Sequence, residues 1–185
     1  DVLRTKLEAQ AALCADRCLT LVQAFIARQQ NVEESLLTEL VDDVWGNHAL
    51  LEKIRQHESL LYKKKFKENF ILKVTVISRS VEHLRNMARA LNALDDSGYD
   101  IIMARELQHL ADQSGRALVR FVKNGALTDQ GDLEQAVSVL KTTFLTIRKE
   151  GLIRRFDAEK LVQVFSFYSS LVYLADDILA GINEA

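Results

Sequence analysis

Proline is absent from this sequence of 185 residues, and glycine occurs only seven times. Average usage would place roughly nine prolines in a chain of this length. Because proline breaks helix interiors and is used mainly in loops and turns, its absence predicts long helices joined by short connections. The sequence also lacks any run of 18 or more apolar residues, so no segment of it is expected to span a bilayer.

Cysteine is scarce, and the familiar catalytic motifs are missing. Cys14 and Cys18 lie four positions apart, on one face of a predicted helix, where free thiols pack as small hydrophobic groups. We therefore expect both in the core and a reducing compartment, with a metal-binding thiol pair as the minor alternative. Phosphate-binding glycine loops, a nucleophile elbow and an H-E-x-x-H zinc helix do not occur. We expect no enzyme activity, no catalytic residues, no metal site and no cofactor.

The overall composition is that of an ordinary globular protein. Apolar residues make up 48% and charged residues 27%, and the net charge is −2. This balance favours a folded chain with a hydrophobic core, and the length suits one domain over residues 1–185. A charge so close to zero gives no electrostatic reason to expect nucleic acid as a partner.

Apolar residues recur at helical spacing in about six segments, which glycines and polar clusters separate. The predicted helices run from Val2 to Gln30, from Glu33 past Ile54, from the lysine-rich stretch to Leu94, from Asp100 to Lys123, from Thr128 or Asp132 to Gly151, and from an N-cap at Asp157 to Ile182. The last has an apolar face wide enough to be central in the molecule. No internal repeat is recognised. The predicted fold is an all-α antiparallel helical bundle.

Three local features suggest chemistry only weakly. Glu106 and His109 form an E-x-x-H pair, but a di-metal bundle needs two such pairs and further glutamates. His57 and Glu58 are adjacent in the sequence, and adjacent residues on a helix point in different directions. Trp45, the only tryptophan, is expected to be a packing residue, with a ligand platform as the alternative. None of these features predicts an active site.

The strongest local charge feature is a cluster of four lysines interleaved with aromatic residues. The lysines are Lys63, Lys64, Lys65 and Lys67. Three interpretations stay open: the solvated end of a helix, a surface near anionic lipid headgroups, or a contact with nucleic-acid phosphates. The low net charge counts against the third, so a basic surface close to a membrane is the functional interpretation.

The C-terminal part resembles the fusaric-acid-resistance superfamily, also called the aromatic acid exporters. The residues that carry the resemblance are 147–151, 154–161, 164–168 and 171–178, an acidic helix start followed by an aromatic-rich helix. The order of helices is similar over most of the chain. The resemblance implies a helical domain at the cytoplasmic side of the inner membrane, cut from a longer membrane protein. It implies an assembly or regulatory role in a transporter of aromatic acids or related organic anions.

The resemblance implies the transporter's own transmembrane region as a partner. The last helix has more apolar surface than one partner helix would cover, which suggests a second copy of the chain as another partner, and burial inside a six-helix domain explains that surface equally well. Within the last helix, the residues proposed for such an interface are Phe165, Tyr168, Leu171 and Val172. The alternative is a free-standing cytosolic interaction or regulatory module similar to PhoU, although the acidic metal-binding repeats of that family are missing from this sequence. The resemblance assigns no catalytic residue to any position.

Overall fold

The computed structural model describes residues 2–28, 32, 35–56, 64–94, 101–124, 130–151 and 157–185. These residues form six helices and, within the described ranges, no strand, which confirms the predicted all-α bundle. The helices are α1 (Val2–Ile26), α2 (Ser35–Gln56), α3 (Lys64–Ala93), α4 (Ala104–Asn124), α5 (Gln130–Lys149) and α6 (Ala158–Glu184). No described helix is both long enough and apolar enough for a bilayer crossing.

The helix ends follow local chemistry at two informative places. Asp157 caps α6 as predicted, because its side chain accepts a hydrogen bond from the backbone N–H of Lys160 at 2.9 Å. The start predicted for the fourth helix, Asp100, lies outside the described residues. In the structure α4 begins at Ala104, after Met103 has adopted a φ of 60°. A right-handed helix cannot pass through that backbone conformation.

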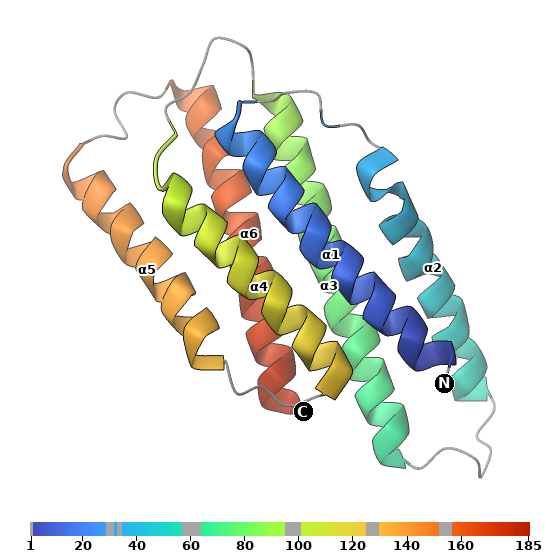
Figure 1. Cartoon of the computed structure of the whole chain (residues 1–185). Helices are drawn as coiled ribbons and strands as arrows, with labels where there is room; N and C mark the ends of the chain where they lie inside the picture. The colour runs from blue at the N-terminus through green and yellow to red at the C-terminus, as the bar shows by residue number, and fades with distance from the viewer. Residues whose placement is uncertain are drawn as a thin grey trace.

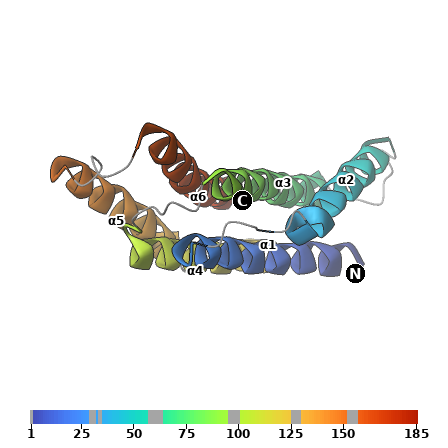
Figure 2. The same cartoon turned by 90° about the horizontal axis from the view of Figure 1, so that it is seen from above.

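The helices are arranged in two layers with a helix at each edge (Figures 1 and 2). One layer is the antiparallel pair α1 and α4, and the other is the antiparallel pair α3 and α6. Helix α2 packs on α1 and α3 at one edge, and α5 packs on α4 and α6 at the opposite edge. The main core therefore lies between the four inner helices, with smaller contributions from α2 and α5.

Large side chains fill the space between the layers. Phe25 of α1 stacks on Phe167 of α6 with ring centroids 4.3 Å apart, and Tyr168 meets Phe25 edge to face. Cys14 and Cys18 are buried in the core as free thiols, as the sequence predicts. Trp45, in contrast, is 70% exposed on α2, so the expectation that it is a packing residue was wrong.

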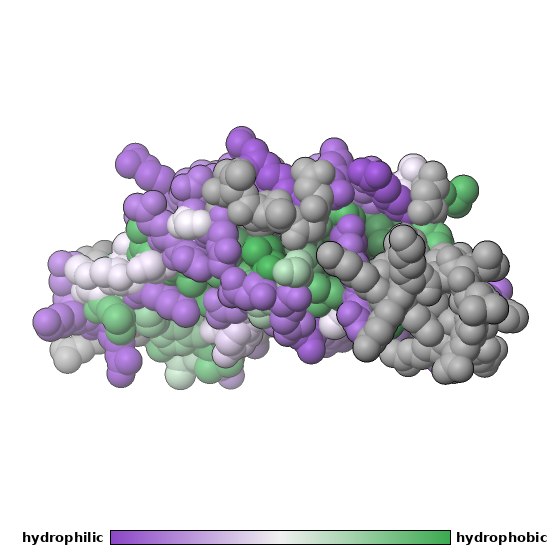
Figure 3. All heavy atoms as spheres, turned by 90° about the horizontal axis from the view of Figure 1, so that it is seen from below, coloured by the Kyte–Doolittle hydropathy of each residue, from purple (hydrophilic) through white to green (hydrophobic). Residues whose placement is uncertain are grey.

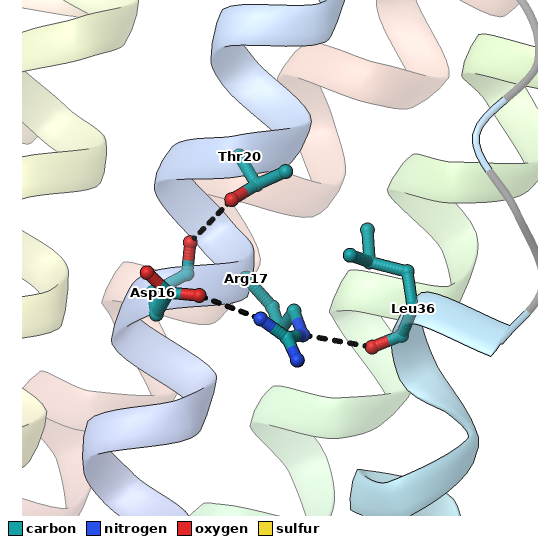
Figure 4. A network of polar contacts seen from close by, with 4 residues as sticks. All are labelled: Asp16, Arg17, Thr20 and Leu36. Carbon is teal, nitrogen blue, oxygen red and sulfur yellow. Dashed lines mark hydrogen bonds and ion pairs between the residues drawn. The ribbon is translucent and has the colours of Figure 1, made fainter.

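Polar contacts attach the first turn of α2 to α1 (Figure 4). Arg17 donates from Nε to the backbone oxygen of Leu36 at 2.9 Å, and its Nη1 pairs with Asp16 at 2.6 Å. Leu36 is in the first turn, and its carbonyl has further acceptor capacity that the guanidinium uses. Arg17 thus holds the start of α2 beside the middle of α1.

The chain contains two similar three-helix units that the sequence did not reveal. Helices α1 and α4 bury the same positions when their residues are compared 100 positions apart. The matched buried pairs are Leu7 and Leu107, Gln10 and Leu110, Ala11 and Ala111, Cys14 and Ser114, Cys18 and Leu118, Leu21 and Phe121, and Val22 and Val122. Three of these seven pairs are identical and four differ, so the repeat is mainly one of burial pattern and packing.

The other helices extend the correspondence. Helices α3 and α6 match with a separation of 94 positions; Phe70, Val74, Ile77 and Leu84 pair with Val164, Tyr168, Leu171 and Ile178. Helices α2 and α5 match with a separation of 96, which aligns Leu37 and Leu40 with Leu133 and Ala136. A half-turn therefore exchanges α1–α2–α3 with α4–α5–α6, as the view from above shows (Figure 2).

Two contacts locate the axis of this approximate two-fold symmetry. A β-carbon built on Gly115 would lie only 2.9 Å from that of its own equivalent, Ala15. His83 contacts its own equivalent, Asp177, at 2.5 Å between Nε2 and Oδ2. Because a residue meets its own equivalent only on a two-fold axis, the axis passes through both contacts.

Candidate functional site

The candidate site is a pocket where α5 and α6 diverge. Its volume is about 270 Å³, at the small end of the range for small-molecule sites. The walls are mainly apolar and come from the middle of α5, the middle of α6 and the residue before α4. The lining residues are Met103, Leu140, Lys141, Phe144, Phe165, Tyr168, Ser169, Val172, Tyr173 and Asp176.

Aromatic side chains make up much of the wall. Phe144 of α5 and Phe165 of α6 meet edge to face with centroids 5.1 Å apart, and both are half-buried. Tyr173 is 57% exposed. Partly exposed aromatic faces present both apolar area and a polarised ring to a ligand, a combination suited to another aromatic group.

One cation and one carboxylate line the same pocket. Lys141 is exposed on α5, and Asp176 is half-buried on α6. Neither makes a salt bridge or side-chain hydrogen bond with the described residues. A charged ligand group can therefore bind one of them without first displacing a protein partner.

A strained backbone segment lies beside the pocket. Met103 has a φ of 60° although it is not glycine, and its side chain is buried and lines the pocket. The hydroxyl of Tyr168, another lining residue, donates to the carbonyl of Ile102 at 2.7 Å. Non-glycine residues in this region cost of order 1 kcal/mol or more, and they persist where surrounding contacts hold them. Tyr168 thus couples the pocket wall to the start of α4.

The pocket exists because α5 and α2 are attached to the four inner helices differently. In the first unit α2 is buried along its length, from Leu37 to Leu51, and Asn47 exchanges two hydrogen bonds with Gln10. In the second unit the positions equivalent to Gln10 and Asn47 are Leu110 and Thr143, which cannot form that pair. No residue of α5 after Leu140 is fully buried, and its second half contacts the other helices only through partly buried side chains such as Phe144 and Ile147.

No protein-family model and no curated protein matches the chain. The functional interpretation therefore depends on the geometry.

The structure divides the four interface residues proposed on α6. Phe165, Tyr168 and Val172 line the pocket, Phe165 and Val172 half-buried and Tyr168 with 5% exposure. Leu171 is 0% exposed and lies in the core, because it points between the two layers. The structure thus places Leu171 in the interior and not on a surface that a second copy could contact.

The basic cluster is described only in part. Lys63 lies outside the described residues, and so do His57 and Glu58. Lys64, Lys65 and Lys67 belong to the first turns of α3, but their side chains are also outside the described part of the structure. The interpretation of this cluster as a membrane-proximal surface stays a prediction.

The E-x-x-H pair on α4 is formed by Glu106 and His109. Glu106 is half-buried and His109 is exposed. Among the described residues, no group of three or more histidine, cysteine or acidic side chains is placed to hold a metal ion. In the described part of the chain, the two residues therefore form a surface pair.

Burial perturbs several titratable groups, all of them away from the pocket. Burial raises the pKa of both Cys14 and Cys18 to about 12, so these thiols are protonated and unreactive near neutral pH. Burial, and then the charge of Glu39, raises the pKa of Asp43. Burial, and then the charge of Arg4, lowers the pKa of Lys73. None of these groups faces a second functional side chain in a way that indicates catalysis.

Sequence reasoning missed the contact between His83 and Asp177. The two residues come from α3 and α6, 94 positions apart, and the ring of His83 also lies 6.1 Å from that of Tyr173. No local pattern marks either residue. Only the repeat, once recognised, would have shown that they are equivalent positions on facing helices.

Proposed function

We propose that the chain is a non-catalytic helical domain of a membrane transporter similar to the aromatic acid exporters. In this proposal the domain lies at the cytoplasmic side of the inner membrane, with Lys63–Lys67 near anionic headgroups. It regulates or assembles the transporter by binding a small aromatic acid in the α5–α6 pocket. The observation that supports this function is the pocket itself, with partly exposed aromatic walls and a lysine that has no partner among the described residues.

The pocket chemistry defines how such a ligand would bind. An aromatic ring would lie against Phe144, Phe165 and Tyr168, where stacking and apolar burial both favour it. A carboxylate on the ring would pair with Lys141. Asp176 would repel the same carboxylate, so the ligand has to place its charge toward α5 and its ring toward α6. Ligand binding would then connect two helices that are otherwise loosely joined.

Calorimetric titration with benzoate, benzamide and benzylamine tests the charge preference. We expect benzoate to bind most tightly. Lys141→Gln should weaken benzoate binding about fivefold, because losing a partly exposed charge pair costs about 1 kcal/mol of binding free energy. Asp176→Asn should strengthen it by a similar factor, because the repulsion is removed. Lys149→Gln, on the same helix but outside the pocket, should change nothing.

Blocking the pocket tests the location. Ser169 lines the pocket and is exposed, so Ser169→Trp should fill it without disturbing the core and abolish benzoate binding. Ala180→Trp adds the same side chain at an exposed α6 position outside the pocket and should bind normally. Equal binding by both variants, or preference for benzylamine over benzoate, would contradict the proposed ligand.

The place of the domain in a transporter needs a separate measurement. Reading the coding sequence upstream of Asp1 distinguishes the two alternatives. Several hydrophobic segments there would support the transporter domain. A start codon directly before Asp1 would leave a free-standing, PhoU-like regulatory bundle, to which the pocket experiments apply unchanged.

A further inference from the structure

The outward face of α5 carries no charged residue over three turns. The helix buries Leu133, Ala136, Val137 and Leu140, and the residues on the opposite side are spaced three or four apart. These outward residues are Gln135, Ser138, Val139, Thr142, Leu145 and Thr146, and all six are exposed. Exposed helix faces normally carry charges, and exposed Val139 and Leu145 add apolar area in the middle of this one.

The equivalent face of α2 carries charges, and three of its six residues are half-buried. With the separation of 96 positions, the outward residues of α5 correspond to Glu39, Asp42, Asp43, Gly46, Ala49 and Leu50. Three carboxylates of α2 therefore occupy the places of Gln135, Ser138 and Val139. The two edge helices share a role in packing, so this difference in surface chemistry is not a requirement of the fold.

Helix α5 is also the outermost helix on its side of the molecule (Figures 1 and 2). Its packing partners among the described elements are α4 and α6. Seen from below, hydrophilic residues cover most of the surface that is not grey, and hydrophobic residues show between them at the lower left, in the centre and at the right edge (Figure 3). Among the described elements, nothing packs on the uncharged face of α5.

The charges at the two ends of α5 indicate what that molecule is. Asp132 and Glu134 lie in the first turns, and Arg148 and Lys149 in the last. Two antiparallel copies of such a helix bring acidic ends to basic ends and align their dipoles favourably. We propose that a second copy of this chain packs its α5 antiparallel against the uncharged face of α5, forming a two-fold dimer.

The spacing of the residues gives the register. With Thr142 at the dimer axis, Val139 of one copy lies at the same level as Leu145 of the partner subunit, because each lies three residues from the axis. Glu134 lies on the flank of the same face and reaches Arg148 of the partner subunit. Symmetry makes each of these contacts twice, as an isologous interface requires. The inference is independent of the proposed ligand.

Sedimentation equilibrium on the whole chain measures the association. The parent should dimerise, and Leu145→Lys should raise the dimer dissociation constant about tenfold or more, because it buries unpaired charge at the centre of the interface. Ala49→Lys is the matched control, since Ala49 is the exposed α2 residue equivalent to Leu145. This variant should dimerise like the parent. A parent chain that remains monomeric at 0.1 mM (roughly the highest concentration needed for a weak specific dimer) overturns the proposal.

Two further variants test the antiparallel register. Thr142→Cys should form an intermolecular disulfide on mild oxidation, because the dimer axis brings the two copies of that residue together. The native thiols of Cys14 and Cys18 should not form disulfides under these conditions, since burial raises their pKa to about 12. Ala49→Cys should not cross-link.

Glu134→Arg should weaken the dimer, and adding Arg148→Glu should restore it; a double variant weaker than either single one would rule out the proposed pairing.

Discussion

Gly115 shows how one position can be governed by a residue far away in the sequence. It lies in the middle of α4, where alanine usually stabilises a helix by about 1 kcal/mol relative to glycine. However, an added β-carbon would lie 2.9 Å from the β-carbon and 3.2 Å from the α-carbon of Ala15. Neither atom can move without shifting α1, so the close approach of the two helices requires glycine here.

We expect Gly115→Ala to lower the free energy of unfolding by about 1–2 kcal/mol, because overpacking outweighs the gain in helix propensity. Urea denaturation followed by circular dichroism measures the change. Gly131→Ala is the matched control, since nothing lies within 4 Å of its added β-carbon and α5 should gain about 0.5 kcal/mol. A stabilised Gly115→Ala variant would show that α1 and α4 are not in such close contact.

The helices themselves could largely be predicted from the sequence, and the reasons are local. Apolar spacing gave all six helices, and Asp157 capped the last one as expected. The start of α4 could not be predicted, because Met103 is held at positive φ by packing. The exposure of Trp45 could not be predicted either, because the spacing of apolar residues does not distinguish the edge helix α2 from an inner helix.

The pocket and the repeat could not be predicted because both depend on relations between helices. Leu171 and Phe165 belong to the same apolar face in the sequence, yet one is in the core and the other lines the pocket. The repeat escaped notice because equivalent positions conserve burial more than identity, as Gln10 and Leu110 illustrate. Apolar pattern specifies which face is buried, and it leaves open which helix covers that face.

At the scale of the element, the Gln10–Asn47 pair determines how firmly α2 is attached to α1. Both side chains are buried, and they exchange hydrogen bonds of 3.1 and 2.6 Å. Asn47→Leu should cost about 1–3 kcal/mol of unfolding free energy, because it leaves the buried amide of Gln10 without a partner. Denaturant unfolding of the variant measures this cost.

A double-mutant cycle separates the hydrogen bonds from the packing. Gln10→Leu combined with Asn47→Leu should cost less than the sum of the two single changes, because no buried amide then remains unpaired. The second unit already carries leucine at the position of Gln10, which shows that the fold accepts it. Simple additivity would mean that the two amides do not depend on each other.

At the scale of the whole molecule, the approximate two-fold symmetry predicts that the chain tolerates circular permutation. The separation of 94 positions between α3 and α6 makes Ala185 equivalent to Leu91. The separation of 100 positions between α1 and α4 makes Asp1 equivalent to Ile101. The native chain joins Leu91 to Ile101 with nine residues, 92–100. A nine-residue glycine–serine linker should therefore join Ala185 to Asp1, and both termini lie at the lower end of the molecule in Figure 1.

We expect the permutant that starts at Ile101 and ends at Leu94 to unfold cooperatively within about 2 kcal/mol of the parent, since loop closure of this length costs little. Circular dichroism and thermal unfolding check this outcome. A permutant opened between Ala111 and Asp112 is the control and should fail to fold, because the cut divides the buried helix α4. Failure of the first permutant alone would contradict the equivalence of the two units.

The carboxylates on the outer side of α2 have a consequence for assembly size. The half-turn makes the two opposite edges of the molecule, α2 and α5, structurally equivalent. If both edges could self-associate, each molecule would bind one neighbour at each edge and an open-ended polymer would form. Glu39, Asp42 and Asp43 make one edge acidic, so two α2 edges repel each other. In the proposed dimer, association would therefore end with the α5–α5 contact, and the difference between the two edges of the molecule would limit the assembly to two copies.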